Sequence, residues 1–175
     1  GYMAPADDKK GEVFWISDAD SQQLAHRWRA EEHAILVGRK TVDDDNPKLT
    51  TRKWTGNNPI RLVIDPNTSI DANAAVLNGA AKTVVFNNSV NKREANVNWV
   101  AITKTEMIKG ILSWCFANEI QSIMVEGGAA TIQGFLTTNF WDECRMLEAG
   151  KPVGNGIMAP VLPEGKKTSK KIVGD

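Results

Sequence analysis

Two strand-to-helix turns hold the residues whose types and spacing are best suited to chemistry. In the first, VEGGAATIQGFL at residues 125–136, an apolar run leads into Gly127 and Gly128, and a helical pattern begins at once. Backbone N–H groups at a helix start are unpaired and lie at the positive end of the helix dipole, which suits a pyrophosphate. On the glycine pair alone a tight turn is the simpler explanation, and the segment is not a GxGxxG fingerprint.

The second turn, GRKT at residues 38–41, offers a hydroxyl and two cations. Thr41 could bind a phosphate or cap its own helix. Arg39 and Lys40 could neutralise the 2′-phosphate of a nucleotide, which would favour NADP over NAD, or they could be solvated surface cations. Both alternatives stay open at this point.

Metal chemistry has little support in the sequence. Asp43, Asp44 and Asp45 are adjacent, but three adjacent carboxylates rarely converge on one ion, and a capped loop explains them more simply. Cys115 and Cys144 have neither Cys-x-x-Cys spacing nor a histidine-rich partner segment. We therefore expect two reduced cysteines and no metal site.

Arginine and histidine side chains supply the remaining candidates. Arg29 and Arg52 could clamp a phosphate or a carbonyl, because guanidinium presents forked donors, although each taken singly is better explained as a surface residue. His26 and His33 have no serine or cysteine nucleophile arrangement nearby, so we assign them no catalytic role.

Length and composition indicate one globular domain. The chain has 175 residues, of which 42% are hydrophobic and 24% charged. Lys plus Arg and Asp plus Glu are both 21, and this zero net charge argues against a general nucleic-acid binder. No apolar run approaches the roughly 18–20 residues of a membrane span, and no signal-peptide pattern is present. We expect a cytoplasmic protein that binds neither nucleic acid nor membranes.

Short apolar runs alternate with helical patterns along the chain. The expected helices cover residues 18–32, 105–118 and 129–138, with a short helix after Gly38. The expected strands cover residues 34–37, 60–64, 82–86, 97–102, 122–126 and 142–149. This order predicts an α/β domain with a mostly parallel central sheet flanked by helices. Both glycine turns then lie at carboxyl ends of strands, where ligands bind in such folds.

Five segments, taken in order, resemble a known family. They are FWIS (14–17), HRWRAEEHAILVGRKTV (26–42), DDNPKLTTR (44–52), NPIRLVID (58–65) and VEGGAATIQGFL (125–136). Together they resemble the C-terminal reductase domain of the bifunctional riboflavin-biosynthesis protein RibD. The resemblance implies a dihydrofolate-reductase-like fold and NADPH-dependent reduction of 5-amino-6-(5-phosphoribosylamino)uracil. In that reaction hydride attacks C1′ of the opened ribose imine and gives the ribitylamino product.

The resemblance also implies roles for individual residues by matched position. The implied cofactor contacts are Trp15, Thr41, Asp45, Pro66, Gly127, Gly128, Ala129, Ala130, Thr131 and Ile132. The implied substrate contacts are Arg29, Leu49, Arg52 and Glu126. A proton must also reach the imine or the ring oxygen. Asp45 and Glu126 are the carboxylates available as catalytic groups, and the sequence does not distinguish between them.

Other functions remain open. A dihydrofolate reductase or another reductase of the same fold is one alternative, and a non-catalytic NADP-binding module is the other. The family's usual first and last strands are missing and Tyr2 replaces a basic residue, so we expect a single reductase domain over residues 1–175, trimmed at both ends. The zinc-deaminase signature of the N-terminal domain to which family members are fused is absent. We expect a homodimer, because the fold commonly dimerises.

Overall fold

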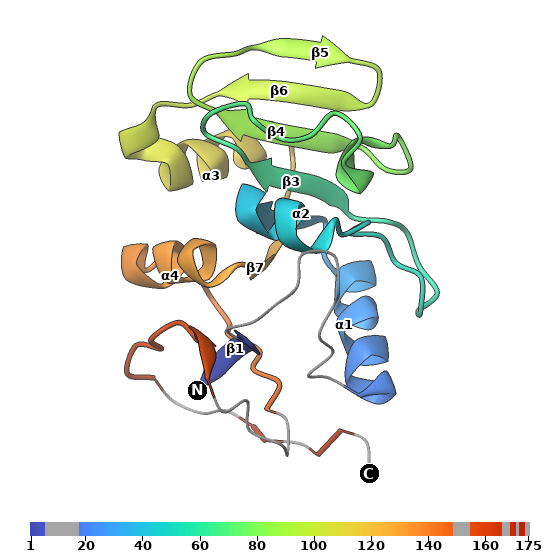
Figure 1. The fold of residues 1–175 in the computed structure, drawn as a ribbon, viewed down its shortest axis with the longest axis vertical. Helices are drawn as coiled ribbons and strands as arrows, with labels where there is room; N and C mark the ends of the chain where they lie inside the picture. The colour runs from blue at the N-terminus through green and yellow to red at the C-terminus, as the bar shows by residue number, and fades with distance from the viewer. Residues whose placement is uncertain (6–17, 149–154, 166–168, 171, 174–175) are drawn as a thin grey trace.

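A six-stranded sheet forms the centre of the computed structural model, which describes residues 1–5, 18–148, 155–165, 169–170 and 172–173 (Figure 1). The strands are β2 (Ala34–Gly38), β3 (Ile60–Ile64), β4 (Thr83–Asn87), β5 (Lys92–Glu94), β6 (Val97–Ala101) and β7 (Ile123–Gly127). They lie in the order β5-β6-β4-β3-β2-β7, and all neighbours are parallel except β5 and β6. The mostly parallel sheet predicted from the alternation of elements is confirmed.

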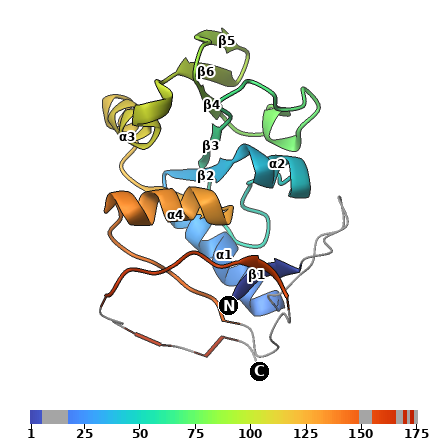
Figure 2. The ribbon, with the colours of Figure 1, turned by 60° about the vertical axis from the view of Figure 1, so that its left-hand side comes forward.

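Helices cover both faces of this sheet. They are α1 (Ala19–Glu31), α2 (Arg39–Asp45), α3 (Met107–Ala117) and α4 (Ala129–Thr138), with short 3-10 turns at Ala75–Leu77 and Lys104–Glu106. Figure 2 shows α2 and α3 on opposite sides of the strands. Such a sheet is buried on both faces, which explains why its central strands are continuous apolar runs.

Each face has its own core. On one face Ile111 and Cys115 of α3 and Phe135 of α4 pack on Leu36 and Phe86. On the other face the packed residues come from α2, from the segment after it and from residues 70–77, and they include Val42, Leu49 and Val76 on Ile35 and Val63. The sheet is therefore packed against helices on both faces, and this packing makes the ends of its strands rigid.

The three helices expected with stated bounds match the structure to within two residues at each end, and the short helix expected after Gly38 is α2. Asp18 begins α1 as its N-cap and accepts a hydrogen bond of 2.7 Å from the Ser21 N–H. Among the described residues no helix is both long and apolar enough to cross a bilayer.

The expected strand at residues 142–149 is wrong, since residues 142–148 form none. Charged side chains in this segment bind across to other elements instead. Arg145 contacts Glu143 at 3.0 Å and Glu32 at 3.3 Å, and its guanidinium lies 5.2 Å from the ring centre of Trp28. These contacts hold the segment against the end of α1 without a strand ladder.

A separate antiparallel pair was not expected from the sequence. It joins β1 (Tyr2–Pro5) to β8 (Gly156–Met158), with Tyr2 opposite Met158. Side chains on this ribbon are exposed, among them Tyr2, Met3, Ile157 and Met158. Four- and three-residue strands far apart in the chain carry too little pattern to be recognised.

Candidate active site at the carboxyl ends of the strands

The two glycine turns lie side by side. β2 and β7 are parallel neighbours with Val37 opposite Gly127, so α2 and α4 begin next to each other. The turns also interlock. A Cβ on Gly38 would lie 2.6 Å from Thr131 Oγ1, and a Cβ on Gly128 would lie 3.2 Å from Thr41 Oγ1. The structure therefore places Thr41 of the first turn beside the glycine pair of the second.

The start of α4 has no side-chain cap. Its N-cap residue is Gly128, which has no side chain to accept from the first turn, and the Gly127–Gly128 peptide bond is cis. The Ile132 N–H is used inside the helix, where it donates to the Gly128 carbonyl at 3.1 Å. Exposure rises along the turn, from buried Gly127 to exposed Ala130. The amides of residues 129–131 are thus first-turn donors without an intrahelical partner.

Glu126 and Arg29 bind each other directly before this turn. Arg29 Nε donates to Glu126 Oε1 at 2.7 Å, and Arg29 NH2 donates to Oε2 at 2.6 Å. The two side chains are only 16% and 22% exposed. Such a forked, charge-assisted pair has a fixed geometry, so it holds the guanidinium of α1 at the end of β7.

Arg52 lies in the segment between α2 and β3, and α1 holds it there. Its backbone N–H donates to His26 Nδ1 at 3.1 Å, and its exposed guanidinium donates through NH1 to Thr50 Oγ1 at 3.2 Å. His26 is 6% exposed and lies one turn before Arg29 on α1. Burial, together with the charges of Arg29, Arg52 and Lys53, lowers the pKa of His26 to about 4. A neutral imidazole therefore lies among three cations.

The sequence indicates no catalytic role for His26, and the structure shows that it accepts the backbone N–H of Arg52. Its spacing of three residues from Arg29 on one helical pattern was an available signal, because residues at that spacing share a helix face. The partner on the loop could not be foreseen, since Arg52 is 26 residues away.

The cations of the GRKT turn are paired. Arg39 bonds to Asp43 and has its Nε 3.9 Å from Asp65 Oδ1, and Lys40 Nζ lies 2.6 Å from Asp44. Asp43 and Asp44 are therefore helical partners of these cations at a spacing of four, and all three aspartates lie in α2 and not in a loop. A depression of about 430 Å³ lies beside Arg39, between α2 and the segment that follows β3.

The other residues implied by the resemblance occupy different environments. Leu49 is 1% exposed and lies in the core, with a left-handed backbone at φ 50°. Pro66 is partly exposed after β3, and its carbonyl accepts from the Asn88 N–H at 3.1 Å. Asp45 is the exposed last residue of α2. Trp15 lies outside the described residues.

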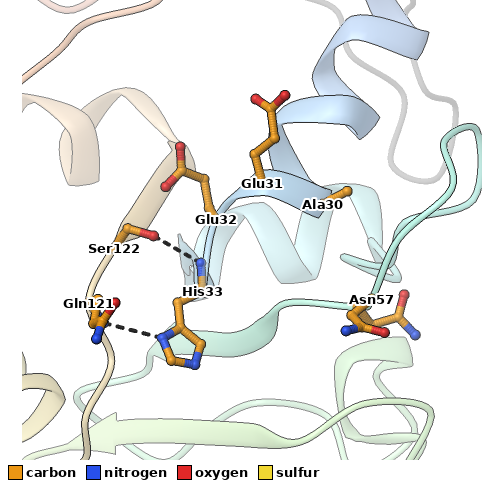
Figure 3. Close-up of a pocket in the computed structure, with 8 residues that line it drawn as sticks. Ala30, Glu31, Glu32, His33, Asn57, Gln121 and Ser122 are labelled. Carbon is orange, nitrogen blue, oxygen red and sulfur yellow. Dashed lines mark hydrogen bonds between the residues drawn. The ribbon is translucent and has the colours of Figure 1, made fainter.

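A second depression lies at the opposite, amino ends of the strands (Figure 3). Its volume is about 320 Å³, and its lining comes from the residues directly before β2, β3 and β7. His33 borders it, with its Nδ1 accepting from the Gln121 N–H at 3.3 Å and its backbone N–H donating to Ser122 Oγ at 3.0 Å. None of the residues implied by the resemblance lines it.

Comparison with known proteins identifies relatives along the whole chain. The family model of the RibD C-terminal domain matches residues 1–173. The chain is 35% identical to the riboflavin biosynthesis protein RibD of Aquifex aeolicus over 153 residues, covering 84% of this chain but 43% of that protein. It is 29% identical to the 2,5-diamino-6-ribosylamino-4(3H)-pyrimidinone 5′-phosphate reductase of Archaeoglobus fulgidus, covering 94% of this chain and 82% of that protein.

A solved structure supports the same assignment. The deaminase/5-amino-6-(5-phosphoribosylamino)uracil reductase of Thermotoga maritima matches with a TM-score of 0.69 at 27% identity, over 89% of this chain and 45% of that protein. The chain thus spans less than half of the two-domain proteins that it matches. With the interlocked glycine turns and the Arg29–Glu126 pair at the ends of β2 and β7, these matches show that the chain belongs to the RibD C-terminal domain family.

Proposed function

We propose that this chain reduces 5-amino-6-(5-phosphoribosylamino)uracil to its ribitylamino product with NADPH, as a step of riboflavin biosynthesis. One observation carries the proposal: the Arg29–Glu126 fork lies directly before the uncapped start of α4. A forked guanidinium that could bind polar groups and free helix amides that could bind a pyrophosphate therefore lie together at the end of β7. The name of the Archaeoglobus relative supports the same reaction class, and the name of the Aquifex relative supports riboflavin biosynthesis.

The residues around the glycine turn fit a dinucleotide. The first-turn amides of α4 would hold the pyrophosphate, and the close approach of Thr41 and Thr131 to the glycines leaves no room for side chains there. Arg39, beside the depression after β3, would meet a 2′-phosphate and so favour NADPH over NADH. The cofactor supplies the hydride, and this chain's task is to align it with the sugar carbon.

Arg29 and Arg52 would hold the substrate. The fork with Glu126 occupies Nε and NH2 of Arg29, so that its NH1 donors remain for a phosphate or for uracil oxygens. Arg52 has an exposed guanidinium and lies close enough to His26 for both arginines to affect the same imidazole. Leu49, whose side chain is in the core, would contribute through its backbone. Asp45 and Glu126 remain the candidates for supplying the proton.

NADPH oxidation tests the function directly. The protein should oxidise NADPH when given the phosphoribosylamino-uracil and should do so faster than it oxidises NADH. The still-aminated pyrimidinone should be tested alongside it, because the Archaeoglobus relative is named for that compound. Turnover of dihydrofolate instead would favour a dihydrofolate reductase. NADPH binding without turnover of either pyrimidine would favour a non-catalytic module.

The Arg52→Ala variant tests the substrate site. Loss of its charged hydrogen bonds should raise KM for the pyrimidine about 10- to 100-fold with little change in kcat, since the substrate's charge is left unpaired. Steady-state kinetics measure both constants. Arg93→Ala, on exposed strand β5, is the matched control and should behave as the wild type. Unchanged kinetics for Arg52→Ala would remove Arg52 from the site.

A homodimer and a cytoplasmic location complete the proposal. The exposed side chains of the β1–β8 ribbon, including Tyr2, Ile157 and Met158, offer an apolar surface to a second copy. In longer family members the reductase domain is joined to an N-terminal zinc deaminase domain, which agrees with the 43% coverage of the Aquifex relative.

A further inference from the structure

The segment that carries Arg52 runs along α1 and is attached to it at several points. Lys53 bonds to Gln22 at the start of the helix, and the Arg27 guanidinium lies 5.6 Å from the ring centre of Trp54. Near the end of the helix Gly56 lies against Ala30, where a Cβ would come within 2.7 Å of the Ala30 Cβ. The segment of residues 52–56 therefore contacts α1 along most of the helix.

The bond between His26 and Arg52 differs from the other attachments because its acceptor, the His26 side chain, is buried. His26 is 6% exposed, and its Nδ1 accepts the Arg52 backbone N–H at 3.1 Å. At the other points Lys53, Arg27 and Trp54 are exposed, so water competes for their contacts. A neutral ring that accepts at Nδ1 carries its proton on Nε2. The imidazole thus defines where the Arg52 backbone lies relative to α1.

We propose that His26 is a positioning residue, which fixes the Arg52 backbone against α1 so that Arg52 and Arg29 reach the same group of the substrate. The inference rests on the proposed function, because it needs a substrate that both arginines hold. α1 supplies both anchors, since Arg29 lies one turn after His26 and is itself fixed by Glu126. The two guanidinium groups, which come from separate segments, are then both held in position by α1.

The charges around His26 keep it in the accepting form. Arg29 from α1 and Arg52 and Lys53 from the loop all disfavour an imidazolium, and burial does so most strongly, with the pKa lowered to about 4. In the folded protein the ring is therefore neutral, and the bond intact, at any pH well above about 4. As the pH falls toward 4 the ring gains a proton, loses its acceptor and becomes a fourth cation. The Arg52 backbone should then no longer be held against α1.

Kinetics of His26 variants test the proposal. His26→Ala should raise KM for the pyrimidine roughly tenfold with kcat nearly unchanged. His26→Asn, whose side-chain oxygen can take the place of Nδ1, should restore most of the loss. In an Arg52→Ala background His26→Ala should add nothing further, because its effect passes through Arg52. Additive losses, or a fall in kcat rather than a rise in KM, would overturn the proposal.

His33→Ala is the matched control for His26→Ala. His33 also accepts a backbone N–H at Nδ1, from Gln121 at 3.3 Å, but at the amino ends of the strands (Figure 3). Its replacement should leave KM and kcat unchanged. A rise in KM equal to that of His26→Ala would show that the effect is a general loss of structure.

Nuclear magnetic resonance separates this inference from the proposed function. A scalar coupling between the Arg52 amide nitrogen and the His26 ring should be present at pH 7 and should disappear as His26 titrates near pH 4. If the coupling is present in the wild type but His26→Ala leaves KM unchanged, the positioning role is overturned while the reductase function stands. Absence of turnover in the wild type would refute the proposed function and with it the role in substrate binding, while the coupling would still report the bond.

Discussion

At the scale of single residues, Glu126 has a different environment from the one that its sequence position indicates. Its place before the glycine pair made it a candidate substrate contact and proton donor. In the structure both of its oxygens accept from Arg29, so orienting that guanidinium is the task that the geometry supports best. The other carboxylate candidate, Asp45, is exposed at the far end of α2.

Glu126→Gln separates the two roles of Glu126. Gln keeps the shape but loses the charge that Arg29 needs, so KM for the pyrimidine should rise while kcat changes only a few-fold. A general acid would behave differently, since its loss lowers kcat by roughly 10²–10⁴-fold. Steady-state kinetics distinguish these outcomes, and a selective fall in kcat of that size would return Glu126 to the role of proton donor.

At the scale of elements, the site depends on how closely α2 and α4 begin beside each other. Gly38→Ala tests this packing. Its new Cβ would lie 2.6 Å from Thr131 Oγ1, so the Thr131 side chain must rotate or the helix starts must separate, and the free energy of unfolding should fall by about 1–3 kcal/mol. The backbone at Gly38, with φ −83°, accepts alanine, so the loss comes from the clash.

Thr131→Ala provides the matching rescue. Removal of the hydroxyl from the partner should restore most of the stability of Gly38→Ala in urea unfolding. If the double variant is as unstable as the single one, the two turns do not interlock through this contact.

The sequence predicts elements well where a local pattern specifies them. Residues 129–138 form the expected helix and residues 60–64 the expected strand, because each has a continuous pattern with clear end signals. β5 was missed because its three residues are all exposed and charged. Residues 142–148 were assigned wrongly because apolar Met146 and Leu147, which indicate a strand, are exposed there. Contacts between distant segments, such as the bond from Arg52 to His26, have no local signal at all.

At the scale of the whole molecule, a buried cation links the sheet to the segment that carries the site. Arg61 of β3 is 0% exposed, and its acceptors among the described residues are all neutral oxygens. Its Nε donates to Thr83 Oγ1 at 2.9 Å and its NH2 to the Ala81 carbonyl at 2.6 Å. NH1 reaches the Lys48 carbonyl at 3.4 Å, close in sequence to Arg52. Burial lowers the pKa of this guanidinium.

Arg61→Met should therefore destabilise the entire domain. Methionine fills similar space but leaves carbonyls of three separate segments without their donor, so the free energy of unfolding should fall by about 2–4 kcal/mol. Urea unfolding measures this loss, and Arg93→Met on exposed β5 should stay within about 0.5 kcal/mol of the wild type. If Arg61→Met is as stable as that control, desolvation of the cation costs as much as its hydrogen bonds contribute, and the link to Lys48 adds no net stability. A loss of the expected size would show that the hydrogen bonds of Arg61 contribute net stability despite the burial of its charge.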